Sequence, residues 1–360
     1  MFNAPGWAPR PRDVTAATNR SERSPAFGTL FLVIAVYGAG GIGCYVGGRL
    51  AATGTPVTFI GRPRMAAELA THGLHLTDYL GADLRVADVP FETTPAGAAK
   101  ADLVLVTVKS AATEGAAEEL ADVLSPGTVV VSFQNGVRNG EALRSRLTEQ
   151  VVVTGMVPFN VLNRGAGVFH QGTEGALDVQ RDAALAPYLE AFERAGLPLA
   201  QHDDILPVQW AKLLLNLNNP INALSNLPLR DELSQRAYRR CLAAAQAETL
   251  KLLDAAGIRP AQLLAVPMHR FPTVLRLPDF LFRRLASKVL AVDPLARTSM
   301  WEDLEAGRTT EIDYLNGEVV RLAESLGRTA PVNARLVELI RAAETDRRSW
   351  SGPDLLRTLS

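Results

Sequence analysis

Short runs of consecutive apolar residues recur through the first half of the chain. Four of them are LFLVIAVYG from Leu30, PVTFIGR from Pro56, ADLVLVTVKS from Ala101 and GTVVVSFQNGV from Gly127. This pattern is typical of strands that are buried on both faces of a parallel sheet. VVVTGMVPFNVL and GVFHQGTEGALDV predict further strands with a hairpin between them, and we interpret His170 there as a structural residue. We therefore predict a doubly wound, Rossmann-type α/β domain at residues 31–202.

From about Asp203 the apolar spacing becomes helical. QWAKLLLNLNNPINALSNLP and RDELSQRAYRRCLAAAQAETLKLLDAAG repeat apolar residues at intervals of three and four. Gly257 should end the second of these helices, because glycine favours the position after a helix C-terminus. Later segments, interrupted by prolines, are helical as well. We predict an all-α domain at residues 203–350, with a substrate cleft between the two domains.

Residues 1–30 differ from the rest in composition. They are rich in Pro, Arg, Ser and Thr and have no apolar period, so we expect a disordered leader. A targeting peptide would be poor in acids and amphipathic, whereas this segment contains Asp13, Glu22 and several prolines. A tail, or a start site placed too far upstream, is the favoured interpretation.

A glycine-rich turn follows the first predicted strand. Gly38, Gly40 and Gly43 form G-x-G-x-x-G between a strand and a helix, and a second strand follows at the expected distance. In such a turn the first glycine allows the bend, the second admits a pyrophosphate, and the third lets the helix pack closely. The motif predicts a dinucleotide site, and the alternative is a glycine-rich turn in an unrelated α/β domain.

The residues after the second strand indicate which dinucleotide is bound. NAD sites usually place an acid there for the ribose 2′-hydroxyl, whereas this chain has Gly61, Arg62 and, close behind, Arg64. A guanidinium suits a 2′-phosphate, so NADPH/NADP+ is the expected cofactor. A solvated Arg62 would leave the choice open. Lys109 and Asn135 follow two other strands, at the sheet edge where ligands bind, although a solvated lysine and a simple turn would also fit.

Three polar residues lie on one face of the apolar helix near residue 212. Lys212, Asn216 and Asn219 are spaced i, i+4 and i+7. Hydride delivery to a ketone creates an alkoxide that needs a proton donor about 3 Å away, and burial lowers a lysine's pKa toward working pH. The stripe therefore indicates a substrate-facing edge. Alternatively, Lys212 extends to solvent and the asparagines cap neighbouring helices.

Composition excludes several other classes of protein. The net charge is -1 with 21% charged residues, which argues against nucleic-acid binding, and no apolar run is long enough for a membrane span. Cys44 and Cys241 belong to no metal-binding motif. We expect a soluble, cytoplasmic protein without a metal, whose partner is a small molecule.

Taken in order, the motifs resemble those of the ketopantoate reductases (2-dehydropantoate 2-reductases). The resemblance runs from about residue 34 to about residue 343 and rests on GAGGIG, VTVKS, QNGV, WAKLLLN, TSMWEDLEAGR and TEIDYLNG. TEIDYLNG is the most specific of these. The implied function is NADPH-dependent reduction of a 2-oxo acid, above all 2-dehydropantoate to (R)-pantoate. The resemblance also leaves room for a homodimer.

The resemblance implies a role for each matching residue. Lys212 would be the general acid, Glu311 an acid close to that lysine and the cofactor, and Asn135 a contact of both cofactor and substrate. Further substrate contacts are implied for Asn216, Asn219, Ser299 and Asp303. Cofactor contacts are implied for Arg62 and Lys109 near the adenosine, and for the turn Gly38, Ala39, Gly40, Gly41, Ile42 and Gly43.

Two departures from the family pattern concern the substrate. Pro220 stands where the family has an asparagine eight residues after the lysine, and Asn219 precedes it. Arg230, in PLRDEL, replaces a further family asparagine. A relative that reduces another 2-oxo acid or carbonyl, and a non-catalytic NADP(H)-sensing regulator, are therefore the alternatives. The retained Lys212, Asn135 and Glu311 argue against the regulator.

Overall fold

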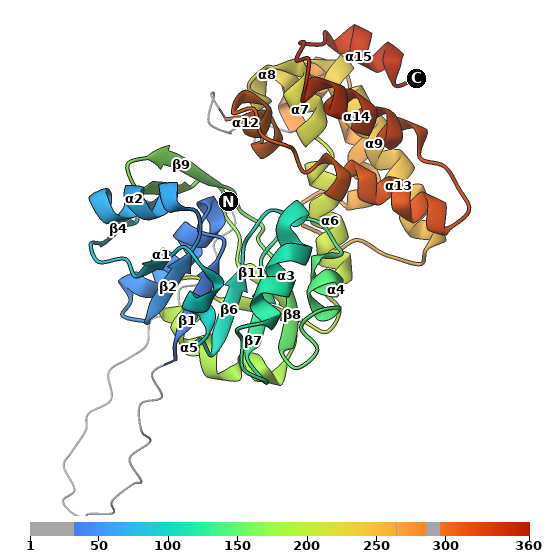
Figure 1. The fold of residues 1–360 in the computed structure, drawn as a ribbon. Coiled ribbons are helices and arrows are strands. Elements are labelled where there is room, and N and C mark those ends of the chain that lie inside the picture. The colour runs from blue at the N-terminus through green and yellow to red at the C-terminus, as the bar shows by residue number, and fades with distance from the viewer. Residues whose placement is uncertain (1–31, 264, 286–295) are drawn as a thin grey trace, which may run out of the picture. The chain divides into compact units, whose positions relative to one another are not determined.

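The first half of the computed structural model is built on a mostly parallel sheet (Figure 1). The structure describes residues 32–263, 265–285 and 296–360, so the expected leader, residues 1–30, lies outside the described residues. The strand order is β12-β11-β8-β7-β6-β1-β2-β5. Its strands are β1 (Ile34–Tyr37), β2 (Val57–Ile60), β5 (Phe91–Glu92), β6 (Leu103–Val106), β7 (Val129–Ser132), β8 (Val151–Met156), β11 (Leu177–Gln180) and β12 (Leu199–His202).

The order of connection reverses between β1 and β6, the place where open α/β sheets bind ligands. Both strands are buried at every position. Val36 and Leu105 face α1 (Gly41–Ala52) and α5 (Leu189–Arg194), whereas Ala35 and Val104 face α3 (Thr113–Ala121) and α4 (Asn139–Arg144). Each of the valine and leucine side chains contributes about 1.5–3 kcal/mol by leaving water. Helices on both faces confirm the predicted fold class.

A smaller sheet adjoins this domain, with strand order β4-β3-β10-β9. Its strands are β3 (Leu74–Asp78), β4 (Asp83–Val86), β9 (Val161–Gly165) and β10 (Val168–Gln171), and α2 (Pro63–His72) precedes them. Strands β9 and β10 pair antiparallel, which confirms the predicted hairpin. His170 lies on β10, with its Nδ1 2.8 Å from the Thr77 hydroxyl on β3, in keeping with a structural role.

Helix α1 contacts both sheets. It approaches them closely because it has two consecutive buried glycines, each of which faces one of the sheets. A Cβ at Gly47 would lie 2.6 Å from Val36 Cγ2 and 2.7 Å from the Phe59 ring, and one at Gly48 would lie 2.9 Å from Leu76 Cδ1. Side chains at either position would therefore force helix and sheet apart.

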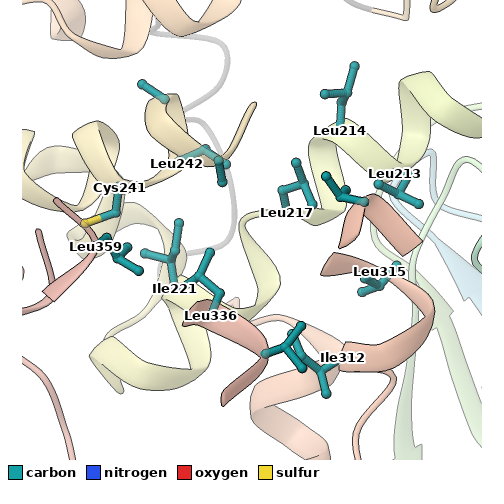
Figure 2. Packing of buried hydrophobic residues seen from close by; sticks show 14 of the residues in the cluster. Leu213, Leu214, Leu217, Ile221, Cys241, Leu242, Ile312, Leu315, Leu336 and Leu359 are labelled. Atoms are coloured by element: carbon teal, nitrogen blue, oxygen red, sulfur yellow. The ribbon is translucent and has the colours of Figure 1, made fainter. Parts of the chain in front are cut away.

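The second half is helical and has its own apolar core (Figure 2). Strand β12 ends at His202 and α6 begins at Leu206, so the predicted boundary at residue 203 falls in the turn between them. The helices are α6 (Leu206–Asn216), α7 (Asn219–Ser225), α8 (Leu229–Ser234), α9 (Arg236–Ala255), α10 (Phe271–Leu275), α11 (Asp279–Leu285), α12 (Ser299–Glu305), α13 (Asn316–Ser325), α14 (Pro331–Ala343) and α15 (Gly352–Thr358).

The ends of two helices bear on the sequence predictions. Gly257 has φ +71° after α9, and Ile258 N–H donates to the Leu253 carbonyl at 2.8 Å, so glycine ends this helix as predicted. Helix α15 lies beyond residue 350, the predicted end of the domain, and packs on α9, where the Tyr238 hydroxyl donates to the Trp350 carbonyl at 2.7 Å.

None of the helices in the described ranges combines the length and apolarity needed to span a bilayer.

Candidate active site

The glycine-rich turn has the geometry of a pyrophosphate site. Gly38 has φ +107°, and a Cβ at Gly43 would lie 2.4 Å from the Gly38 carbonyl oxygen, so both positions need glycine. Around Gly40, by contrast, the nearest such atom to an added Cβ is Gly38 O at 4.0 Å. The first N–H groups of α1 have no partner within the helix and carry the positive end of its dipole. The turn can therefore accept an anion against bare backbone.

Arg62 directly precedes α2, at the carboxyl end of β2. It has extended backbone geometry and is exposed. In the described ranges no hydrogen bond or ion pair engages its guanidinium, and Arg64 is exposed as well. An exposed guanidinium next to the glycine turn is suited to a phosphate on the ribose.

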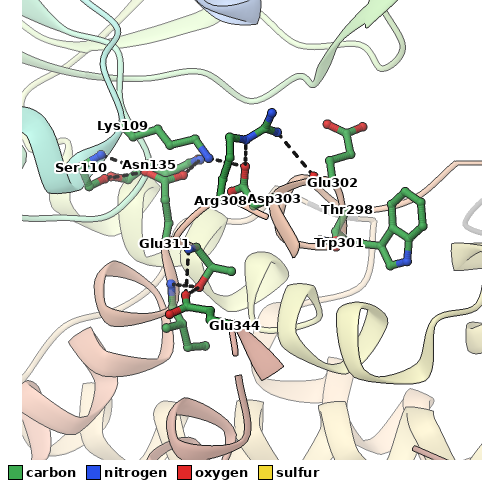
Figure 3. Close-up of polar contacts among 12 residues, drawn as sticks. Lys109, Ser110, Asn135, Thr298, Trp301, Glu302, Asp303, Arg308, Glu311 and Glu344 are labelled. Carbon is green, nitrogen blue, oxygen red and sulfur yellow. Dashed lines mark hydrogen bonds and ion pairs between the residues drawn. The ribbon is translucent and has the colours of Figure 1, made fainter. Parts of the chain in front are cut away.

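Lys109 and Asp303, predicted to bind cofactor and substrate respectively, pair with each other (Figure 3). Lys109 follows β6, and Asp303 is a buried residue of α12. The same Asp303 Oδ1 accepts from Arg308 Nε at 3.0 Å. Oδ1 of Asp303 is thus shared by two cations, and the substrate role of this residue stays a prediction.

Glu311 joins the helical half to two strand ends of the large sheet (Figure 3). Its Oε1 accepts from Ser110 N–H at 3.0 Å and from the Ser110 hydroxyl at 2.9 Å. Its Oε2 accepts from Asn135 Nδ2 at 3.1 Å. The Ser110 hydroxyl has one hydrogen, which it can donate either to Glu311 or to the Asn135 carbonyl at 3.0 Å, and that carbonyl also accepts from Asn139 Nδ2 at 2.5 Å. Asn135 is therefore fixed through both its backbone and its side chain.

The backbone next to Glu311 is anchored from the other side. Thr310 donates to Glu344 Oε1 through its N–H at 2.9 Å and its hydroxyl at 2.8 Å. Glu344 directly follows α14. The side chain of Glu311 therefore projects toward the sheet from a segment that is held on the helical core.

Lys212 lies in the middle of α6, and its flanking leucines are buried in the helical core (Figure 2). Its ammonium donates to the Pro158 carbonyl at 2.8 Å, in the segment that follows β8. Burial lowers the pKa of Lys212 to about 8. Among the described residues no ion pair joins Lys212 to Glu311, which the resemblance places close together, and the oxygens of Glu311 accept from Ser110 and Asn135.

Comparison with known proteins identifies the family. Residues 34–183 match the family model "Ketopantoate reductase PanE/ApbA", and residues 204–344 match the model of its C-terminal domain. The chain belongs to the ketopantoate reductase family. The predicted family is thereby confirmed, and with it the class of enzyme, an oxidoreductase.

Relatives of the family match nearly the whole described chain. The 2-dehydropantoate 2-reductase of Pyrococcus horikoshii is 29% identical over 324 residues, covering 87% of this chain and 97% of that protein. A PanE/ApbA family ketopantoate reductase from Ralstonia eutropha superposes with a TM-score of 0.76 at 30% identity, covering 88% of this chain and 99% of that one. D-mandelate dehydrogenase with NADH and anilino(oxo)acetate, 20% identical with a TM-score of 0.73 over 87% of this chain and 98% of that one, shares the fold.

In this ketopantoate reductase fold, the other predicted substrate contacts lie at helix termini. Asn216 is the last residue of α6 and Asn219 the first of α7, and both are partly buried. Ser299 is the exposed first residue of α12. The substrate roles of these residues stay predictions.

The sequence did not single out several residues that build this arrangement. Ser110 holds both Glu311 and Asn135, the Pro158 carbonyl accepts from Lys212, and Arg308 shares Asp303. Ser110 and Arg308 lie inside the quoted motifs VTVKS and TSMWEDLEAGR, so their place next to predicted site residues was a usable signal. A backbone carbonyl such as that of Pro158 leaves no signal in sequence.

Proposed function

We propose that this protein reduces a 2-oxo acid to the 2-hydroxy acid with NADPH, and that its substrate is 2-dehydropantoate, which becomes (R)-pantoate. The observation that carries the proposal is Lys212. It is an ammonium group on an apolar helix, with a pKa of about 8 and a single backbone carbonyl as its partner. Relatives named 2-dehydropantoate 2-reductase support the choice of substrate.

Lys212 supplies the proton in the proposed reaction. Reduction of a ketone leaves negative charge on its oxygen, and a cation at that oxygen stabilises the charge before the proton moves. The Pro158 carbonyl uses one of the three N–H donors of the ammonium, so the others are available to the substrate oxygen. A pKa near 8 means that Lys212 is mostly protonated at neutral pH yet gives up its proton readily.

Asn135 and Glu311 act in this proposal as a fixed polar edge. Asn135 donates one amide hydrogen to Glu311, so the orientation of its carboxamide is set. Its Oδ1 and its remaining N–H are then available to the carbonyl and carboxylate of a substrate or to a carboxamide of the cofactor. Ser110 and Glu311 thus position Asn135.

The residues at the carboxyl ends of β1 and β2 fit NADPH. The glycine turn from Gly38 to Gly43 would hold the pyrophosphate, and Arg62 and Arg64 the 2′-phosphate. When bound, NADPH supplies the hydride for the carbonyl carbon. The open space at Gly40 suits the pyrophosphate of either dinucleotide, and the guanidinium of Arg62, which has no partner among the described residues, supports NADPH over NADH.

A different 2-oxo acid is the second candidate substrate. Arg230, which replaces a family asparagine, is exposed directly after the start of α8, and Asn219 begins α7 one residue earlier than the family pattern. Both changes concern expected substrate contacts. An arginine there favours a more acidic substrate than the neutral asparagine does.

A substrate screen tests the proposal. Purified protein is mixed with NADPH and each of a panel of 2-oxo acids, which includes 2-dehydropantoate, a phenyl-substituted acid and a dicarboxylic acid. We expect loss of NADPH absorbance with 2-dehydropantoate at the highest kcat/KM. No turnover with any 2-oxo acid would refute the proposed reaction. The homodimer and the cytoplasmic location stay predictions.

A further inference from the structure

The helical core contains a carboxyl group that the proposed reaction does not use. Glu232 of α8 is fully buried, with no exposed surface. Its Oε2 accepts from Asn222 Nδ2 at 2.7 Å and from Asn218 Nδ2 at 3.3 Å. No cation pairs with it in the described ranges. A buried carboxylate without a counter-ion is costly, so the protonation state of Glu232 needs an explanation.

Two buried oxygens of this network have no hydrogen-bond partner in the described part of the chain. They are Glu232 Oε1 and Asn218 Oδ1, and they belong to side chains that already share one hydrogen bond. While Glu232 is ionised, both atoms are acceptors and cannot bond to each other. A proton on Glu232 Oε1 turns it into a donor to Asn218 Oδ1. One proton would therefore satisfy both orphaned atoms and close a two-hydrogen-bond pair between acid and amide.

The network extends from this pair to the predicted substrate contacts. Asn222, held by Glu232, accepts at Oδ1 from Thr298 N–H at 3.1 Å and from its hydroxyl at 3.2 Å. Thr298 is the N-cap of α12 and immediately precedes Ser299. Asn218 lies in the turn between α6 and α7, between Asn216 and Asn219. The three helix termini that present the predicted substrate contacts thus meet at one carboxyl group.

We propose that Glu232 is a positioning residue: as a neutral carboxylic acid it closes a hydrogen-bonded pair with Asn218 and fixes the substrate-facing termini of α6, α7 and α12. Its neutral form is essential to this role, because the ionised form would break the pair and leave two acceptors facing each other. The substrate part of this proposal rests on the proposed function. The protonation itself does not.

The ionisable groups that face Glu232 favour the neutral form. Burial raises the pKa of Glu232 to about 8, although the hydrogen bonds from Asn222 and Asn218 act in the opposite direction. From α9, burial and the nearby Glu232 raise the pKa of Tyr238 and that of Cys241, the latter to about 12. Both therefore stay uncharged at neutral pH, and neither compensates a carboxylate.

Two arginines near this network make contacts other than with Glu232. Arg239 of α9 donates to the Leu233 carbonyl on α8, and its guanidinium pairs with Asp279. Arg297, before α12, lies over the Trp301 ring at 4.2 Å, and its Nη1 is buried without a hydrogen-bond partner in the described ranges. Helix α7, which also packs on α8, carries no ionisable residue.

The proposal predicts a specific dependence of stability on pH. The pKa of Glu232 is about 8 in the folded chain and 4.5 for an ordinary glutamate, so between these values the folded state keeps a proton that the unfolded state has lost. Stability from this group is therefore lost as pH rises, and the unfolding constant grows by up to about tenfold per pH unit in this window. Above about pH 8 the pair opens and KM for the substrate should rise.

Glu232→Gln is the decisive variant. Its amide keeps a donor for Asn218 Oδ1 and an acceptor for the asparagine N–H groups, but cannot ionise. Between about pH 4.5 and pH 8, the ratio of the wild-type unfolding constant to that of the variant should rise by up to about tenfold per pH unit. KM for 2-dehydropantoate should rise above pH 8 in the wild type only. The pH profiles of kcat should coincide, because Lys212 is intact in both.

Glu232→Leu provides the contrast. It removes donor and acceptor together, so KM at pH 7 should rise about tenfold, the scale of one to two lost hydrogen bonds, while Glu232→Gln stays near the wild type. Equal pH dependence of unfolding in wild type and Glu232→Gln would refute the protonated pair. An unchanged KM in Glu232→Leu would refute the role of Glu232 in positioning the substrate-facing helix termini.

If Glu232→Leu does not fold, the pH dependence of KM in Glu232→Gln decides alone. A wild type without any turnover would refute the proposed function and the substrate part, whereas the unfolding data would still decide on the pair.

Discussion

Lys109, at the end of strand β6, and Asp303, on helix α12, form an ion pair across 194 residues of sequence. Asp303 is almost fully buried, whereas about half of the Lys109 side chain is exposed. The pair lies next to the hydrogen bonds of Glu311 with Ser110 and Asn135 (Figure 3). The nucleotide-binding sheet and the helical half are therefore held together at the candidate site by polar contacts.

Removing the charge of Asp303 should weaken this connection. Asp303→Asn leaves Lys109 and Arg308 without their shared carboxylate, but both cations are exposed enough to be hydrated. We expect the free energy of unfolding to fall by about 1–3 kcal/mol, the scale of hydrogen bonds between charged groups. Urea denaturation measures this value. The control is Glu190→Gln, which breaks the exposed Glu190–Arg194 pair and should cost less than about 0.5 kcal/mol. Equal losses in the two variants would show that the buried ion pairs of Asp303 stabilise the fold no more than an exposed pair does.

Lys212→Met tests the proton donor. Methionine keeps the apolar stem, so the fold should persist, but the ammonium is lost. Removal of a general acid costs about 10²–10⁴-fold in rate, and we expect kcat for 2-dehydropantoate to fall by at least about a hundredfold. NADPH affinity should change only a few-fold. Pre-steady-state hydride transfer is the measurement, with the exposed Lys251→Met as control. Transfer at the parent rate would assign the acid to another group.

The lowered pKa of Lys212 predicts the pH dependence of both directions. Reduction needs the protonated form, so kcat should be level below about pH 8 and fall about tenfold per unit above it. Oxidation of the 2-hydroxy acid needs the neutral amine and should rise over the same range. A reduction rate that is constant up to pH 10 would rule out a pKa this low.

The same shift has a consequence for stability. Because the pKa of Lys212 is about 8 in the folded chain and 10.5 for an ordinary lysine, the folded chain loses this proton first as pH rises. The contribution to stability is therefore complete above pH 10.5 and is lost as pH falls through about 8. Lys212→Met should lack this increase in unfolding free energy between the two values. Urea denaturation at pH 8 and pH 10.5 compares them.

Arg62→Ala tests the choice of cofactor. The exposed guanidinium after β2 is free to bind a 2′-phosphate, and its loss should weaken NADPH binding by about 1.5–3 kcal/mol, the value for hydrogen bonds to charged groups. NADH binding should hardly change. Fluorescence titration with both dinucleotides measures this, with Arg85→Ala, an exposed residue of β4, as control. Equal losses for NADPH and NADH would show that Arg62 does not bind the 2′-phosphate.

The sequence predicts the features that depend on neighbouring residues. The glycine turn, the buried parallel strands and helix α6 with Lys212 each follow from local spacing and from the conformational needs of glycine. The pairing of Lys109 with Asp303 and of Ser110 with Glu311 joins residues 194 and 201 positions apart. Such contacts depend on how sheet and helices face each other. The resemblance places Glu311 near Lys212, but it does not reveal that the oxygens of Glu311 accept from Ser110 and Asn135.

Glu232 illustrates a second limit of sequence reasoning. It lies in an otherwise ordinary helical stretch, RDELSQ, between exposed Asp231 and buried Leu233. An acid at such a position is expected at the surface. Only its burial against Asn218 and Asn222 distinguishes it from its neighbours.

The two glycines of α1 decide how closely this helix packs on the two sheets. Because Gly47 and Gly48 let the backbone approach Val36, Phe59 and Leu76, helix α1 packs closely on both sheets at this point. The start of α1, where the pyrophosphate would sit, is consequently set by atoms one to two turns away that never meet the nucleotide. A methyl group at either glycine would push helix α1 away from a sheet and displace its first residues. We therefore expect dinucleotide affinity to depend on packing deep inside the domain.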